Sequence, residues 1–307
     1  MGILAGEDVA AMKPAIPWLM AVLMFSSGLG LRLQDLQVLR ERPWLLPVIL
    51  VLLHGVVPFL SVTITTLLGF PLETVMGFAI LAMIPVSGTC LLWIGSYGGN
   101  ITLGMTFILV DTIIAPFIIP YVLAFLFGAE VFMDPLRMLH GLFWMLFFPT
   151  VLAVTLNRMS GGGLTRVGGK PIAFLAKVAV FIILFINGGI VSPLFHDFDL
   201  LFFLVLGMVF ALCAFWFLFA FLIGRFLFSC PEDIIAFMEA LSIRSTNTGL
   251  VIAISYFPPL TVLTVVFNML FQQPLGAWAG KAASRYFAKR KAGTDPGEAG
   301  EVKEEAR

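Results

Sequence analysis

Long apolar stretches are the feature that most constrains how this chain can fold. A helix needs about 20 apolar residues to cross the hydrocarbon core of a bilayer. About nine stretches of this kind occur, at residues 15–31, 43–69, 75–97, 101–127, 138–156, 172–190, 200–222, 234–256 and 260–280. Because 60% of the residues are hydrophobic and only 12% are charged, a soluble globular fold is excluded. We therefore predict an all-α polytopic membrane protein that lies in the lipid bilayer.

The charge and cysteine content exclude several other classes of protein. The formal net charge is zero, and no basic stripe is present that could neutralise the phosphates of a nucleic acid. The three cysteines, Cys90, Cys213 and Cys230, are odd in number, and two lie in apolar stretches, so they imply no disulfide framework. We expect no nucleic-acid partner, no cofactor and no metal site.

The distribution of Lys and Arg predicts the orientation in the membrane, because these residues are enriched in short cytoplasmic loops. Basic residues follow the odd-numbered spans: Arg32, Arg40, Arg42, Arg158, Arg166, Lys170, Arg225, Lys281, Arg285, Lys289, Arg290 and Lys291. The opposite side holds mainly acidic residues: Glu73, Glu130, Asp134, Asp197 and Asp199, with Arg137. We predict an extracytoplasmic N-terminus (1–14), a transmembrane domain (15–290) and a disordered cytoplasmic tail (291–307) in a multi-pass protein of the cell membrane.

Two of the predicted spans contain residues that break helices. Residues 85–89 read Pro-Val-Ser-Gly-Thr, and residues 244–249 read Arg-Ser-Thr-Asn-Thr-Gly. Broken helices at matching positions in two halves of a chain indicate a transporter binding site, because unwound backbone is tolerated in a membrane only where it lines a cavity or is buried in protein. A simple kink in each helix is the alternative.

Several motifs along the chain are similar to those of the bile acid:sodium symporter superfamily. They are the segments 16–20 and 24–31, Pro43, Pro58, Pro85 to Thr89, Gly99-Asn100, Ala115-Pro116, Pro120 and Asn247 to Leu250. The resemblance covers nearly all of the membrane part. It implies an inverted-repeat transporter in which a core domain of six helices packs on a panel domain and two broken helices cross in the core. The chain resembles the nine-helix members, which lack the first helix.

The chain departs from this family where the family binds sodium. The resemblance places the sodium-ligand positions on Cys90, Leu91, Gly104, Ile108 and Leu53, and it places the ligand glutamate on Ser242. Most of these side chains offer no oxygen, whereas sodium requires hard oxygen ligands. A cation, Arg244, has appeared in the second break. We therefore expect the family's scaffold without its sodium coupling.

Charged residues inside the predicted spans are further candidates, because a charge at mid-bilayer costs about 2.5–3.5 kcal/mol on insertion scales. Asp111, Glu239 and Arg244 are such residues. We expect Asp111 to face the core and to pair with Arg244, whereas Glu239 lies about 140° from Arg244 on a regular helix. A purely structural ion pair is the alternative. His54 either bonds a neighbouring carbonyl or shuttles protons.

These residues predict a secondary active transporter of a small organic anion that works by alternating access. The predicted substrate or ion site comprises Ser87, Gly88, Thr89, Cys90, Asp111, Arg244, Ser245, Thr246, Asn247 and Thr248, with His54, Asp111 and Glu239 as candidates for proton coupling. One alternative is an arsenite-type metalloid exporter of the same superfamily, which the chain resembles through Thr89-Cys90 and residues 110–112, although Gly249 stands where that group has an acidic residue. An intramembrane enzyme is a further alternative, but no zinc-protease or serine-elbow motif is present. The identity of the solute, the direction of transport and the oligomeric state stay open.

Overall fold

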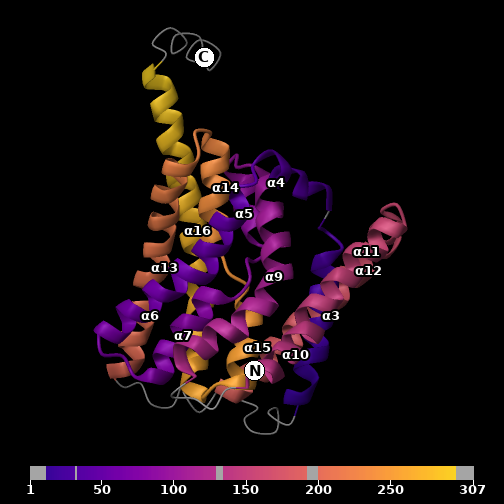
Figure 1. Cartoon of the computed structure of the whole chain (residues 1–307), viewed down its shortest axis with the longest axis vertical. Helices are drawn as coiled ribbons and strands as arrows, with labels where there is room; N and C mark the ends of the chain where they lie inside the picture. The colour runs from indigo at the N-terminus through magenta and orange to yellow at the C-terminus, as the bar shows by residue number, and fades with distance from the viewer. Residues whose placement is uncertain (1–11, 32, 129–133, 192–199, 295–307) are drawn as a thin grey trace, which may run out of the picture.

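The computed structural model describes residues 12–31, 33–128, 134–191 and 200–294, and these residues form helices and connecting loops without a named strand (Figure 1). Within these described residues, six helices are long and apolar enough to cross a membrane: Leu45–Leu67, Ile101–Phe127, Pro135–Met159, Gly163–Gly189, Leu200–Leu227 and Pro259–Arg290. The other three predicted spans correspond to the short helix α3 (Ile16–Gly28) and to two broken helices. The predicted all-α polytopic membrane fold is confirmed.

One group of helices forms the panel domain, which occupies the right side of Figure 1. It contains α3, α10 (Pro135–Leu142), α11 (Phe148–Met159) and α12 (Gly163–Val191), and a π-helical turn, Phe143–Phe147, joins α10 to α11. Helix α3 packs against α11 and α12. The bare backbone of Gly28 allows the close approach of α3 to α11, because a methyl group built on it would lie 2.9 Å from the Thr150 carbonyl oxygen.

The remaining helices, apart from the short α4 (Gln37–Glu41) before α5, form the core domain. They are α5 (Leu45–Val51), α6 (Val57–Leu67), α7 (Leu72–Met83), α8 (Cys90–Ser96), α9 (Ile101–Phe127), α13 (Leu200–Leu227), α14 (Pro231–Ser242), α15 (Thr246–Tyr256) and α16 (Pro259–Thr294). A π-helical turn, Leu52–Val56, joins α5 to α6. Helix α16 packs against α7, α13 and α15, and α14 packs against α9 and α13. The expected division into a core and a panel is therefore present.

Both predicted breaks are real interruptions of the helix and not kinks. Helix α7 ends at Met83 and α8 begins at Cys90, and the backbone at Ile84 is extended (φ −58°, ψ 149°). Helix α14 ends at Ser242 and α15 begins at Thr246, with an extended Ile243 between them (φ −95°, ψ 108°). Each predicted span thus consists of two half-helices, which leave backbone hydrogen-bonding groups free at the break.

The start of α14 is fixed to the start of α9 by polar contacts at one end of the core. Asp233 accepts hydrogen bonds from the Arg42 guanidinium and from Asn100 Nδ2, the latter at 2.8 Å. Asn100 in turn caps α9 by accepting from the Leu103 N–H. The hydrogen bond and the charge of Asp233 raise the pKa of Arg42 above its ordinary value. These contacts hold the first half of the second broken helix in place.

The last helix is longer than the sequence predicts. Helix α16 runs to Thr294, so the basic residues that we assigned to a loop after residue 280 lie on the helix itself, and residues 291–294 of the predicted tail are helical. Helical propensity explains the difference, because the segment 281–292 is rich in Ala, Lys and Arg and contains no proline.

Residues 1–11 and 295–307 of the predicted termini lie outside the described residues, as do Arg32, Glu130, Asp197 and Asp199.

Candidate functional site

The two breaks cross each other and pair through their backbones. Val86 and Arg244 form an isolated antiparallel bridge. The Ser87 N–H donates to the Ile243 carbonyl at 3.0 Å, and the Ser245 N–H donates to the Pro85 carbonyl at 2.8 Å. Each break therefore satisfies the backbone groups that the other leaves free, as an apolar environment requires. We call residues 84–89 and 243–245 the crossover.

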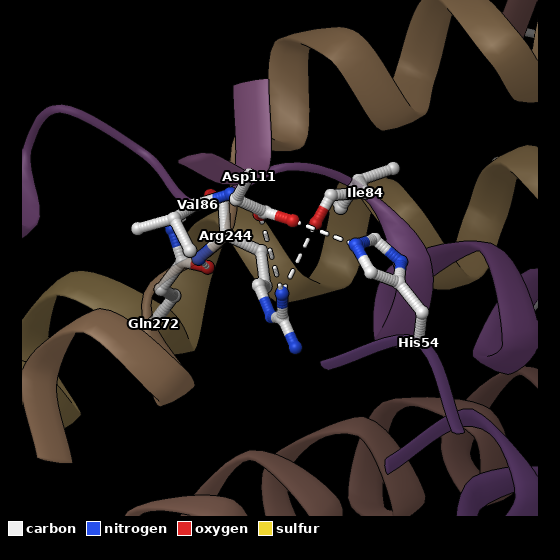
Figure 2. Close-up of polar contacts among 6 residues, drawn as sticks. All are labelled: His54, Ile84, Val86, Asp111, Arg244 and Gln272. Atoms are coloured by element: carbon white, nitrogen blue, oxygen red, sulfur yellow. Dashed lines mark hydrogen bonds and ion pairs between the residues drawn. The ribbon is translucent and has the colours of Figure 1, made fainter. Parts of the chain in front are cut away.

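Asp111 of α9 connects the crossover to α5 and α6 (Figure 2). Its side chain is fully buried. Asp111 Oδ2 accepts a hydrogen bond from the Val86 N–H at 2.6 Å, and Asp111 Oδ1 lies 2.7 Å from His54 Nε2. Because a carboxylate can only accept, His54 donates through Nε2. Of the two roles predicted for His54, the bond to a neighbouring carbonyl is not observed: the imidazole, which lies in the π-helical turn, reaches the carboxylate instead.

Arg244 lies at the centre of the crossover and is only 4% exposed. Its Nη1 lies 4.0 Å from Asp111 Oδ2 and donates to the Ile84 carbonyl at 3.3 Å. The predicted contact between Asp111 and Arg244 is therefore present. We call Asp111, His54 and Arg244 the buried charge cluster.

Gln272 of α16 holds the backbone of Arg244 from the other side (Figure 2). The Arg244 N–H donates to Gln272 Oε1 at 2.9 Å, and Gln272 Nε2 donates to the Arg244 carbonyl at 3.0 Å. Asn268 Nδ2 also donates to Gln272 Oε1, which fixes the orientation of the amide. The side-chain amide thus pairs with the backbone of Arg244 as a neighbouring β-strand would. It satisfies both the N–H and the carbonyl of Arg244. Nothing in the sequence indicates that Gln272 pairs with Arg244.

A small cavity lies beside the buried charge cluster. Its volume is about 40 Å³, and its polar lining comes from Ser61, Ser242, Arg244 and Asn268. Arg244 Nη2 and Ser242 Oγ are buried and have no hydrogen-bond partner. This volume is large enough for a water molecule, which needs about 10–15 Å³.

The accessible residues of the crossover and of the first turn of α15 carry hydroxyl and amide groups. Gly88 and Thr89 are exposed, and Ser87, Ser245, Thr246 and Asn247 are partly exposed. The Ser87 and Thr89 hydroxyls lie 2.9 Å apart, and Gln273 Nε2 donates to Thr89 Oγ1 at 3.0 Å. We call Ser87, Gly88, Thr89, Ser245, Thr246 and Asn247 the polar face. Of the other predicted residues nearby, Thr248 is buried and bonds Ser245, and Cys90 is buried in the hydrophobic core.

The predicted site residues thus separate into three places. The polar face is accessible, and the buried charge cluster lies inside the core. Glu239 of α14 is fully buried, and neither of its carboxylate oxygens has a hydrogen-bond partner. Glu239 therefore joins neither Asp111 nor Arg244 in the structure, although the helix is unwound at Ile243 between them.

The positions where the family resemblance implies sodium ligands do not fit a sodium ion. Leu53 and Ile108 present buried hydrocarbon, and Gly104 has no side chain. The adjacent buried cation, Arg244, adds electrostatic repulsion. Among the residues that the structure describes, no group of three His, Cys, Asp or Glu side chains is placed to hold a metal ion.

Comparison with known proteins agrees with this architecture. The model of the SBF-like CPA transporter family matches residues 4–275. The chain is also 32% identical over 293 residues to YbaS, an uncharacterised protein of Bacillus subtilis (strain 168), and this match covers 94% of the chain and 95% of YbaS. The family match extends over both broken helices and the buried charge cluster. The chain therefore belongs to the SBF-like CPA transporter family, a family of membrane transporters.

Proposed function

We propose that the protein is a secondary active transporter that carries a small organic anion by alternating access. The polar face is the solute site, and the core and panel domains move relative to each other around it. The observation that carries this proposal is the pairing of two broken helices over a buried, fixed cation, Arg244.

The polar face favours an anion because its accessible groups are hydrogen-bond donors. Ser87, Thr89, Ser245 and Thr246 have hydroxyl groups, and Asn247 has an amide. The first-turn N–H groups of α15 lack partners within the helix, and the helix dipole places partial positive charge at this end. None of the six residues of the polar face is acidic. A carboxylate or sulfonate would accept hydrogen bonds from these groups.

In this proposal Arg244 stabilises the crossover, and it does not bind the solute directly. The guanidinium is buried, contacts Asp111 and donates to the Ile84 carbonyl. In sodium-coupled relatives a mobile cation is expected near this position, as the family resemblance implies. A covalently attached cation gives the same local charge balance, but it cannot leave with the solute. Transport by this protein would therefore not depend on sodium.

Two features make the metalloid exporter a weaker candidate. The only thiol near the polar face, among the residues described, is that of Cys90, and it is fully buried in the hydrophobic core. A side chain on Gly249, where that group has an acidic residue, would meet Ile84, since a built methyl lies 2.8 Å from Ile84 Cδ1. A soft-ligand site at the crossover is thus not supported.

The proposal can be tested by measuring the thermal stability of the purified protein with organic anions. Acetate, pyruvate, succinate and taurocholate would be added as choline salts, with choline chloride as the control. A bound ligand stabilises the native state by about 2.7 kcal/mol at 100 times its Kd. We expect saturable stabilisation by at least one carboxylate or sulfonate.

A pair of variants assigns the stabilisation to the polar face. Thr246→Val removes a hydroxyl with little change of volume and should weaken the effect of the anion. Thr66→Val, at an exposed position of α6, is the matched control and should retain it. Stabilisation by organic cations alone, or equal responses of the two variants, would contradict the proposal.

A further inference from the structure

Glu239 is a buried acid that lacks a compensating partner. It lies in the third turn of α14, is fully buried, and neither of its oxygens accepts or donates a hydrogen bond. An ionised carboxylate in such a place would cost several kcal/mol. Protonation removes that cost. The contrast with Asp111 is clear, because Asp111 receives hydrogen bonds from His54 and Val86 and has Arg244 close by.

No cation on the elements around Glu239 compensates its charge, among the residues that the structure describes. Helix α14 packs against α8, α9, α13 and α16. The charged groups on these helices are engaged or exposed elsewhere: Asp111 of α9 contacts Arg244, and Arg225 of α13 lies over the Tyr286 ring. The basic residues Lys281, Arg285, Lys289 and Arg290 of α16 are exposed. On its own helix, Asp233 is held by Arg42, and Glu232 is exposed. The titratable groups near Glu239 are Cys90 and Tyr97, which are neutral in their protonated forms.

The space for the Glu239 carboxyl is provided by two glycines of α16. A methyl group built on Gly280 would lie 2.8 Å from Glu239 Oε1, and one built on Gly276 would lie 3.3 Å from Glu239 Oε2. The same built groups would also meet the rings of Tyr97 and Trp93, respectively. These two rings stack, with centroids 6.2 Å apart and an interplanar angle of 15°. The carboxyl therefore lies in a notch between α16 and a pair of aromatic rings.

One ring of the aromatic pair, Tyr97, borders a large cavity. Tyr97 lines a cavity of about 710 Å³, together with Arg225, Glu232 and Ser284. This cavity lies where α13 ends and α14 begins, the end of the core that we predict to be cytoplasmic. At the other ring, Trp93 Nε1 donates to Gln273, which donates to Thr89 of the polar face. Glu239 thus lies beside one ring that borders the cavity and beside another that is linked by hydrogen bonds to the polar face.

We propose that Glu239 is a proton-binding site, which exchanges its proton with the large cavity when the Tyr97 ring moves. The step is a simple acid dissociation: the carboxyl O–H bond breaks, and the proton passes to water in the cavity. This inference rests on the proposed function for its consequence. If the protein transports an anion without sodium, protonation of Glu239 supplies a coupling ion in place of sodium.

Dicyclohexylcarbodiimide tests the protonation state without any transport substrate, because it adds to protonated carboxyl groups in apolar surroundings. The full-length protein in detergent micelles would be treated, digested and analysed by mass spectrometry. We expect the adduct on Glu239, lost in Glu239→Gln and retained in Glu232→Gln, the matched exposed control on the same helix. The rate should fall by about tenfold or more between mildly acidic and strongly alkaline buffer, as the carboxyl ionises.

The role of Tyr97 is tested by Tyr97→Ala, which should label at least about fivefold faster because the ring no longer covers the notch. An unchanged rate would show that the proton does not pass Tyr97.

Infrared spectroscopy gives a second readout that needs no reagent access, since a protonated carboxyl has a carbonyl stretch that Glu239→Gln must lose. Absence of labelling in both the native protein and Tyr97→Ala, with no infrared difference, would overturn the proposal. Labelling without any anion-dependent stabilisation would refute the proposed function alone, and anion binding by a protein that has an ionised Glu239 would refute this inference alone.

Discussion

Arg244 Nη1 lies 4.0 Å from Asp111 Oδ2 at the point where the two broken helices cross. The cation belongs to one break, and the carboxylate belongs to α9 and also holds the backbone of the other break through the Val86 N–H. Asp111 therefore ties both halves of the crossover together. Within the buried charge cluster, the opposite charges of Asp111 and Arg244 offset each other.

Removing Arg244 should destabilise the protein strongly. Arg244→Ala leaves Asp111 without its cation, and breaking a buried pair in this way costs about 3–5 kcal/mol. The double variant Asp111→Asn, Arg244→Gln removes both charges and should recover a large part of the loss. The melting temperatures of the single and double variants measure this coupling. If Arg244→Ala melts like the native protein, the ion pair carries no stability.

Gln272 should contribute to the stability of the crossover, as the buried charges do. Gln272→Leu leaves the N–H and the carbonyl of Arg244 without partners, at about 1–3 kcal/mol for each buried group. A lowered melting temperature is therefore expected. Gln37→Leu, at an exposed position, is the control and should change stability by less than about 0.5 kcal/mol. Equal melting of the two variants would show that water replaces the Gln272 amide.

Gly77 should tolerate no larger residue, because α7 and α16 meet there. A methyl group built on Gly77 lies 2.5 Å from Thr264 Oγ1 and 2.8 Å from the Thr261 carbonyl. Gly77→Ala should cost about 1–3 kcal/mol through overpacking. The control is Gly207→Ala on α13, where no atom lies within 4 Å of the built methyl, and the better helix propensity should leave stability equal or higher. A stable Gly77→Ala variant would mean that the two helices separate easily.

The orientation in the membrane is a prediction from the Lys and Arg distribution. Reporter fusions at Arg166 and Arg290 should both indicate the cytoplasm, and a fusion at Asp134 should indicate the opposite side. Arg166 lies in the first turns of α12, and Arg290 lies near the end of α16. An extracytoplasmic result at Arg166 or at Arg290 would refute the topology.

The breaks and the charge pair could be predicted because their signals are local or costly. Pro85 removes a backbone hydrogen bond beside Gly88, and a charge within an apolar span is costly unless it is paired. Asp111 and Arg244 could therefore be matched before their distance was known.

Other contacts could not be predicted because they depend on how distant helices pack. Gln272 follows Arg244 by 28 residues, and only the packing of α16 brings its amide to the crossover. His54 reaches Asp111 from a π-helical turn, which has no reliable sequence signal. The notch for Glu239 needs Gly276 and Gly280, but glycines are common in membrane helices and indicated nothing by themselves.

Sodium dependence of transport tests the central claim most directly. The protein would be reconstituted in proteoliposomes, and uptake of the anion that stabilises it most would be measured with sodium and with choline as the only external cation. Because Arg244 replaces the mobile cation as a fixed charge, we expect equal initial rates in the two media. Uptake that collapses in choline and returns with a saturable dependence on sodium would contradict the account.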